Sequence, residues 1–150
     1  MVEPKEPQLR ALLDYWDGKR EGRSMPARGD LDPVEIPELL PHIVLVDTAE
    51  SLAEFRYRLF GTELCKGFGR DRTGLQFAEL PRLANFDEIY RGYWLTFTEK
   101  APQYFHGQID SNEKSHIRYS RLTLPLSADG EHVNMILGGI IFLLGDEPPA

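Results

Sequence analysis

The sequence predicts a single α+β domain, in which helices cover one face of a five-stranded antiparallel sheet and an N-terminal helix flanks the sheet. Two observations predict this fold class. Five short apolar or alternating segments occur as one pair and then one group of three, joined by turn-rich links, which is typical of antiparallel strands. Two longer segments, one at the start and one between the strand groups, instead repeat apolar residues with a helical period.

The length and composition agree with one folded domain. The chain has 150 residues, 41% hydrophobic and 27% charged, as in ordinary globular proteins. We expect residues 8–144 to form the domain, with a flanking helix and an ordered connection over 8–41, and residues 1–7 and 145–150 to be loose ends. A net charge of −7 argues against a nucleic-acid partner. The longest apolar run is too short for a membrane span, and the lone Cys65 with a polar N-terminus predicts a cytoplasmic protein.

The first helical segment begins near Pro7 and ends near Gly18. Four apolar residues fall on one of its faces: Leu9, Leu12, Leu13 and Trp16. Because such a short helix needs a partner surface to persist, this face is expected to pack either on its own sheet or on a second copy, and we assign it to a possible homodimer interface. The proline-rich residues 18–37 predict an irregular connection, with a short helical turn over 35–40.

The first strand pair is predicted over 43–47 and 55–59, where Phe55, Tyr57 and Leu59 alternate with arginines. Gly61 ends the second strand, and Thr62 is expected to cap a short helix that follows.

The longest helical segment runs from about Pro81 to Glu99 and carries an aromatic face. Three strands are predicted after it, near residues 103–109, 117–126 and 132–144. In the second of these the apolar phase changes after Tyr119, which predicts a β-bulge near Ser120 or Arg121.

Two motifs are the most specific parts of the chain, Tyr57-Arg-Leu-Phe-Gly-Thr62 and Gly69-Arg-Asp-Arg-Thr-Gly74. Together with Asp14-Tyr-Trp-Asp-Gly18, with Leu124-Pro-Leu-Ser-Ala-Asp-Gly130 and with this order of elements, they resemble a family of short bacterial stand-alone PAS domains, formerly a domain of unknown function. The resemblance covers nearly the whole chain. It implies structural roles for six motif residues: Arg58, Gly61, Arg70, Asp71, Thr73 and Gly74.

The resemblance implies a non-catalytic sensory or regulatory domain. Such a domain binds a small molecule or a signalling protein in the cleft between helices and sheet, and acts through a separate partner or self-association. From the aromatic helix face and this analogy we expect six residues to line the pocket: Thr62, Tyr90, Trp94, Phe97, Tyr104 and Tyr119. Arg58 is expected to be buried and paired with Asp30 or Asp32.

Cofactor sites and catalysis have little support in the sequence. Leu64-Cys-Lys-Gly-Phe68 lacks most of the Asn-Cys-Arg-Phe-Leu-Gln pattern of flavin-binding blue-light domains, so no covalent flavin is expected. Haem-binding PAS domains place an axial histidine on the long helix, and this helix has no histidine here, so no haem is expected. No metal site is predicted either. The alternative is a cone-shaped α+β enzyme, of the isomerase or dehydratase kind, that uses His106 with Asp110 or Asp47 as an acid–base pair.

Overall fold

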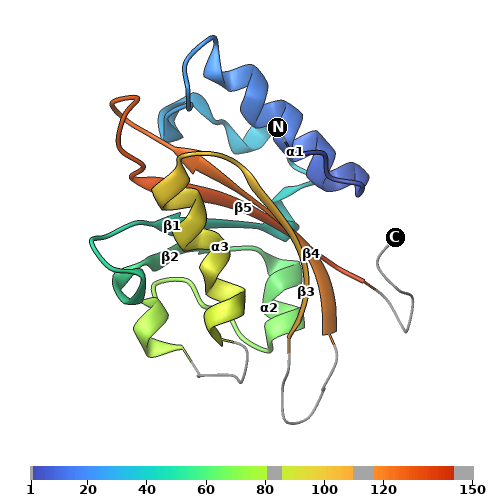
Figure 1. Ribbon diagram of the computed structural model, residues 1–150. Helices are drawn as coiled ribbons and strands as arrows, with labels where there is room; N and C mark the ends of the chain where they lie inside the picture. Colours follow the sequence, from blue (N-terminus) through green and yellow to red (C-terminus); the bar gives the residue numbers. More distant parts are fainter. Residues whose placement is uncertain (1, 81–85, 110–116, 144–150) are drawn as a thin grey trace.

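The computed structural model describes residues 2–80, 86–109 and 117–143, and shows one five-stranded sheet with order β2-β1-β5-β4-β3 (Figure 1). Every neighbouring pair of strands is antiparallel. The fold class predicted from the sequence is therefore confirmed. The elements are α1 (Pro7–Arg20), β1 (Ile43–Asp47), β2 (Arg56–Phe60), α2 (Thr62–Phe68), α3 (Phe86–Glu99), β3 (Gln103–Ile109), β4 (Ile117–Leu126) and β5 (Met135–Phe142).

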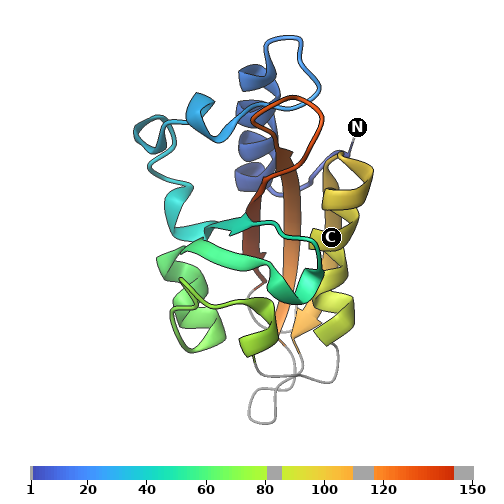
Figure 2. The same cartoon turned by 90° about the vertical axis from the view of Figure 1, so that its left-hand side faces the viewer.

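The sheet lies between α3 on one face and α1 on the other (Figure 2). On the α3 face, the Thr96 hydroxyl hydrogen-bonds the Thr123 hydroxyl of β4 at 2.6 Å. On the α1 face, Leu9 and Leu12 press against the backbone of Gly139 in β5, where a side chain would collide with both. Glycine at this position therefore allows α1 to approach the sheet closely. Within the described ranges, every helix is too short or too polar to span a bilayer.

The apolar face of α1 packs on the sheet of its own chain. Leu9, Leu12, Leu13 and Trp16 keep at most 6% of their surface exposed. The Trp16 indole N–H also donates a hydrogen bond of 2.9 Å to the carbonyl of Pro125 in β4. The assignment of these four residues to a dimer interface is therefore wrong, because they already bury the outer face of the sheet.

Strand β4 has no bulge, so that prediction is wrong. Its register with β3 and with β5 runs without interruption past Ser120 and Arg121. Residues 119–126 are all buried, because α3 covers one face of the strand and α1 covers the other. A strand that is buried on both faces carries apolar residues on both and shows no alternation of apolar and polar residues. The change in the apolar pattern after Tyr119 therefore does not require a β-bulge.

The irregularity in the sheet lies instead between β1 and β2. Leu45 pairs with Leu59 and Val46 pairs with Tyr57, which leaves Arg58 unmatched. In a regular strand, Tyr57 and Leu59 would face the same side of the sheet. The extra residue instead places Tyr57 on the α3 face and Leu59 on the α1 face.

Several element boundaries differ from the sequence prediction. Gly61, not Thr62, is the N-cap of α2, and no side chain caps this helix. A hydrogen-bonded turn is present within the range 35–40, where the Leu39 N–H donates to the Ile36 carbonyl at 3.1 Å. Two 3₁₀ turns, Pro33–Glu35 and Leu40–His42, flank it. Strand β5 begins at Met135, because the residues before it form a hydrogen-bonded turn. Residues 81–85, expected to begin the long helix, and the tail over 145–150 lie outside the described residues.

Candidate functional site

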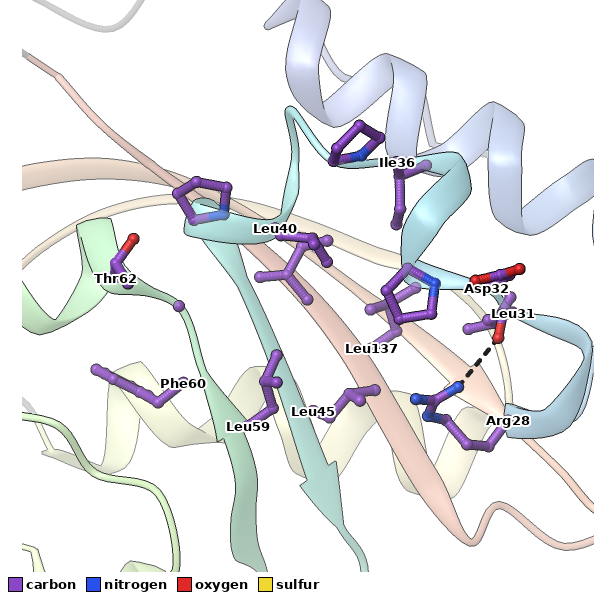
Figure 3. A pocket seen from close by; sticks show the side chains of 15 residues that line it. Arg28, Leu31, Asp32, Ile36, Leu40, Leu45, Leu59, Phe60, Thr62 and Leu137 are labelled. Carbon is purple, nitrogen blue, oxygen red and sulfur yellow. Dashed lines mark hydrogen bonds between the residues drawn. The ribbon is translucent and has the colours of Figure 1, made fainter.

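A half-open groove of about 440 Å³ lies on the α1 face of the sheet (Figure 3). Its floor consists of side chains from β1, β2 and β5, namely Ile43, Leu45, Leu59 and Leu137. The opposite wall is the connection between α1 and β1, which contributes Leu31, Ile36 and Leu40. The volume and the apolar lining are those of a small-molecule site.

The wall of the groove is bonded to α1 through one tyrosine. The Tyr15 hydroxyl accepts a hydrogen bond of 2.9 Å from the Asp32 backbone N–H. It also donates one of 2.8 Å to the Glu35 carboxylate, which forms an ion pair of 3.0 Å with Lys19. The hydrogen bonds from Lys19 and Tyr15 lower the pKa of Glu35. These bonds join the wall of the groove to α1.

Few polar groups reach the groove. The Arg28 guanidinium stands at one end and donates to the Leu31 carbonyl at 3.1 Å. Asp32 also lines the groove, and its carboxylate accepts from the Val34 N–H at 3.0 Å. Leu59 is 39% exposed, which is unusual for a large apolar side chain and opens the floor of the groove to solvent.

Of the six residues predicted to line a pocket, only Thr62 lies at this groove. Tyr90 and Tyr119 lie instead in the buried core, and Trp94 and Phe97 are partly buried and pack against it. Three of these residues belong to α3, namely Tyr90, Trp94 and Phe97. Tyr104 lies on the α1 face, because it pairs with Leu122 and its hydroxyl donates 2.7 Å to the Glu6 carboxylate. The expectation that Tyr104 lines one pocket with the aromatic residues of α3 is wrong. A shift of one residue in strand register places its side chain on the opposite face of the sheet.

The layer between α3 and the sheet is filled by aromatic rings of the chain itself. The Phe77 ring lies 4.6 Å from that of Tyr90 and 5.1 Å from that of Tyr57. At the other end of α3 the Phe97 ring meets Phe55 edge-on at 5.4 Å. Such contacts stabilise a packed core.

Two arginines lie in this aromatic layer, and sequence reasoning did not single them out. Arg72 precedes Thr73 in the glycine-rich motif and is 6% exposed, whereas Arg121 in β4 is 2% exposed. The signal for Arg121 was present, since it is the one charged residue in the run 119–126. The same motif contains a second arginine, Arg70, which is exposed. The conformation of the turn over 69–74 determines that Arg72 points inward and Arg70 does not.

Arg58 is an exposed surface residue. Its guanidinium pairs with Asp47 on the adjacent strand at 3.0 Å, and 61% of the side chain is exposed. The expected partners are engaged elsewhere, Asp30 with Arg23 at 2.8 Å and Asp32 with the backbone of its own turn. The prediction of a buried Arg58 is wrong, because the irregularity in β2 turns it outward beside Asp47.

The glycine-rich motif forms a local turn. The Asp71 carboxylate accepts hydrogen bonds from the backbone N–H and the hydroxyl of Thr73, at 2.9 and 2.6 Å. These bonds lower the pKa of Asp71. Gly74 has a φ of +88° and its N–H donates to the Tyr57 carbonyl at 2.7 Å, which joins the turn to β2.

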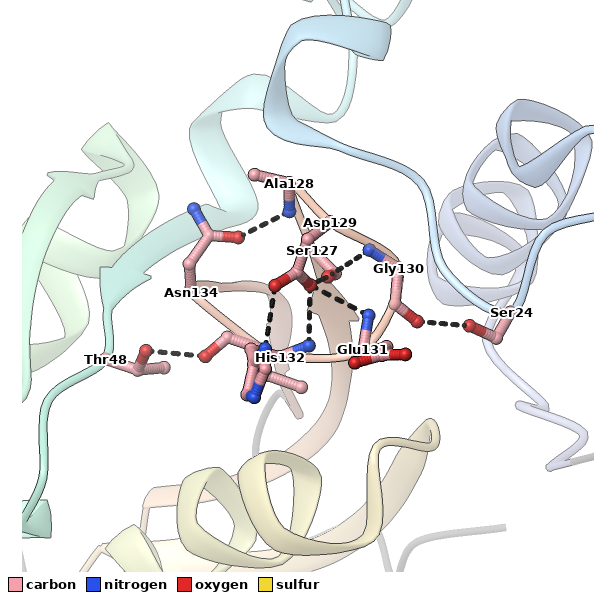
Figure 4. A network of polar contacts seen from close by, with 10 residues as sticks. Ser24, Thr48, Ser127, Ala128, Asp129, Gly130, Glu131, His132 and Asn134 are labelled. Atoms are coloured by element: carbon pink, nitrogen blue, oxygen red, sulfur yellow. Dashed lines mark hydrogen bonds and ion pairs between the residues drawn. The ribbon is translucent and has the colours of Figure 1, made fainter.

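The turn between β4 and β5 is organised by Asp129 (Figure 4). Its carboxylate accepts hydrogen bonds from the backbone N–H groups of Glu131 and His132 and from the Ser127 hydroxyl. The turn also contacts two distant segments, since the Ser24 hydroxyl donates to the Gly130 carbonyl and the Thr48 hydroxyl to that of Val133. The hydrogen bonds from His132, Glu131 and Ser127 lower the pKa of Asp129 strongly.

Asp129→Asn is expected to lower the midpoint of thermal unfolding at neutral pH, because the amide accepts fewer hydrogen bonds. A carboxyl with a depressed pKa stabilises the fold above its ordinary value of 3.8 and loses this effect as the pH falls further. The difference between the variant and the wild type should therefore shrink steadily below that pH. Calorimetry over an acid series measures it, with Glu131→Gln as the matched control. A difference that is constant with pH would contradict the assignment.

The polar cluster around His106 does not include Asp47, one of the two carboxylates expected to form an acid–base pair with it. His106 Nδ1 lies 2.9 Å from the Ser120 hydroxyl, and that hydroxyl donates 2.6 Å to the Glu6 carboxylate. Asp47 is on β1, which β4 and β5 separate from β3, so the pairing of His106 with Asp47 is wrong. The other proposed partner, Asp110, lies outside the described residues.

This cluster instead attaches the segment before α1 to the sheet. The sequence predicts a loose end over 1–7, whereas Glu6 is held by Ser120 and Tyr104 in the structure. Burial raises the pKa of Glu6, but these two hydrogen bonds outweigh burial and lower it overall. Within the described residues, no three His, Cys, Asp or Glu side chains lie close enough together to bind a metal ion.

The comparisons with known proteins point to one fold and one family. The PAS domain of BvgS from Bordetella pertussis is 20% identical, with a TM-score of 0.55 over 75% of this chain and 84% of that one. A LOV protein from Rhodobacter sphaeroides is 13% identical, with a TM-score of 0.54 over 75% and 69% of the two chains. No curated protein matches the chain. A family model described as a PAS domain matches residues 4–141, and since this is nearly the whole chain, the protein belongs to that PAS domain family.

Proposed function

We propose that this PAS domain is a non-catalytic sensory or regulatory module in the cytoplasm, which binds a small molecule and passes the signal to a separate protein or through self-association. The apolar groove beside β1 and β2 carries this proposal. An occupant of the groove would contact the sheet on one side and residues 31–40 on the other.

The coupling from groove to surface follows from the bonds of Tyr15. This side chain joins α1 to the groove wall at Asp32 and Glu35, so an occupant that moves the wall also moves α1. The polar side of α1 faces outward and carries the exposed residues Arg10, Asp14 and Asp17. A partner protein or a second copy that binds this polar side would therefore sense the state of the groove.

The chemistry of the groove limits its ligand. An apolar floor and wall favour an apolar molecule, and Arg28 and Asp32 at one end would orient a single polar group on it. Thr62 contributes a hydroxyl at the opposite side of the groove in the view of Figure 3. The proposed ligand is therefore a mainly apolar small molecule with one polar end.

Two measurements test this function. Native mass spectrometry of the purified chain is expected to show a small-molecule increment over the denatured mass. Binding of the apolar dye anilinonaphthalene sulfonate should be much weaker in Leu59→Trp, because the larger ring fills the groove from an exposed position. Val34→Trp is the matched control, since Val34 is 81% exposed and lies outside the groove lining. Equal dye binding by both variants, together with a bare polypeptide mass, would overturn the proposal.

A further inference from the structure

Arg28, at one end of the groove, differs from the other basic side chains of its segment, because it has no carboxylate partner among the described residues. The other three basic residues of the segment 19–28 each form an ion pair with an acidic side chain: Lys19 with Glu35, Arg20 with Asp17 and Arg23 with Asp30. Arg28 instead lines the groove (Figure 3). Its positive charge is therefore available to a molecule bound there.

The turn that contains Arg28 holds its side chain in place. Residues Arg28–Asp30 form a 3₁₀ turn, which the Leu31 N–H closes by donating to the Arg28 carbonyl at 3.1 Å. The Asp30 carboxylate fixes the start of this turn, because it accepts a hydrogen bond of 2.8 Å from the Ala27 N–H. The guanidinium in turn donates to the Leu31 carbonyl at 3.1 Å. A group that is already positioned loses little conformational entropy when a ligand binds.

Most donors of the Arg28 guanidinium are not used by the protein. A guanidinium carries five N–H groups, and in the described part of the chain that of Arg28 makes one side-chain hydrogen bond, to a neutral carbonyl. The side chain is half-buried beside the apolar lining of the groove, where charged hydrogen bonds are stronger than in open water. Two adjacent N–H groups of a guanidinium match the two oxygens of a carboxylate. This end of the groove is therefore suited to a carboxylate.

Asp32 limits the negative charge that a ligand can carry. It lines the same groove, and its carboxylate accepts a hydrogen bond of 3.0 Å from the Val34 N–H. Like charges that are brought together on binding repel each other, so a doubly charged head group such as a phosphate monoester is a poorer match. A single negative charge placed on Arg28 is the better match. The apolar floor then takes the hydrocarbon part of the ligand.

We propose that the groove binds an apolar monocarboxylic acid, with its carboxylate on the Arg28 guanidinium and its hydrocarbon part along Leu45, Leu59 and Leu137. This inference rests on the function proposed above and names the ligand class of that site. Arg28 is the residue that selects a carboxylate over a neutral or positively charged head group.

Four probes of equal chain length test the head group on the full wild-type chain. Octanoate, octanamide, octylamine and octyl phosphate are each titrated below their micelle concentrations, by calorimetry and by displacement of anilinonaphthalene sulfonate. Octanoate is expected to bind about tenfold or more tighter than octanamide, the usual gain from one charged hydrogen bond. Octylamine should bind most weakly. Equal affinities for octanoate and octanamide, or tighter binding of octyl phosphate, would overturn the ligand class.

Variants of Arg28 separate recognition of the carboxylate from support of the groove wall. Arg28→Gln should remove the preference for octanoate over octanamide, and Arg28→Lys should keep part of it, because the charge remains without the paired N–H groups. Arg10→Gln is the matched control, since Arg10 is exposed on α1 and outside the groove lining. It should keep the full preference. An equal loss of affinity for both probes in Arg28→Gln would show that Arg28 only holds the Leu31 carbonyl, and would overturn its assignment.

The comparison of probes needs no variant, so it decides the ligand class even if Arg28→Gln does not fold. The inference and the function on which it rests also fail in different ways. If octanoate does not bind while dye binding still depends on Leu59, the ligand class is wrong and the groove remains a binding site. If Leu59→Trp and Val34→Trp bind the dye equally and the polypeptide mass is bare, both proposals fail.

Discussion

Trp16→Ala is expected to lower the free energy of unfolding by about 3–5 kcal/mol, the usual range for removing a large aromatic side chain from a core. Trp16 is among the largest fully buried side chains and keeps 1% of its surface exposed. Its loss would leave a cavity between α1 and β4 and an unpaired carbonyl at Pro125. A small domain is rarely stable by more than about 5–15 kcal/mol, so this one substitution should bring the chain close to unfolding.

The control for this prediction is Trp16→Phe, which keeps most of the apolar volume and loses the indole N–H. It should cost much less than alanine, because the packing against the sheet largely remains. Urea unfolding followed by far-ultraviolet circular dichroism measures both variants. A loss below about 1 kcal/mol for alanine would mean that α1 detaches from the sheet in solution, contrary to the burial of its apolar face.

Gly61→Ala is expected to destabilise the protein by about 1–3 kcal/mol, as overpacking of a closed contact does. A Cβ at this position would overlap the backbone carbonyl of Pro41 and lie 2.8 Å from the carbonyl oxygen of Leu40. These atoms belong to backbone, so they cannot rotate out of the way. The Gly61 N–H also donates to the Ile43 carbonyl at 2.8 Å, which holds the strand end in place.

Gly18→Ala is the matched control, because a Cβ there meets no atom within 4 Å. Gly18 lies inside α1, so alanine should stabilise the helix by about 0.5–1 kcal/mol. The two glycine substitutions should thus change the unfolding midpoint in opposite directions. Gly61 and Pro41 both line the groove, so Gly61→Ala should also weaken dye binding there. A neutral effect of Gly61→Ala would contradict the close approach of these two segments.

The secondary structure was largely predictable from local patterns. Leu9, Leu12, Leu13 and Trp16 repeat with the helical period, and they do lie on one buried face of α1. The third strand of the sheet was predicted over 103–109, where β3 is observed. The apolar pattern gives a wrong prediction of a bulge in β4, because a strand that is covered on both faces carries no alternating signal.

The partners of individual side chains were much less predictable. Arg58 was expected to meet Asp30 or Asp32, but its real partner is Asp47 across the β1–β2 irregularity. Tyr104 and Tyr119 were both assigned to one pocket, although the strand pleat places Tyr104 on the α1 face and Tyr119 beside Arg121 on the α3 face. A shift of one residue reverses the face of a strand residue, and a single sequence does not set that register.

The order of helices and strands, the family motifs and the absence of a surplus of positive charge all follow from the amino-acid sequence alone. These properties depend on neighbouring residues or on simple sums, so they can be read along the chain. The groove beside Leu59 and the burial of Arg72 and Arg121 become visible in the folded chain. Both features form where segments that are far apart in the sequence come into contact. These contacts depend on which segments cover each face of the sheet, and no local sequence pattern specifies that.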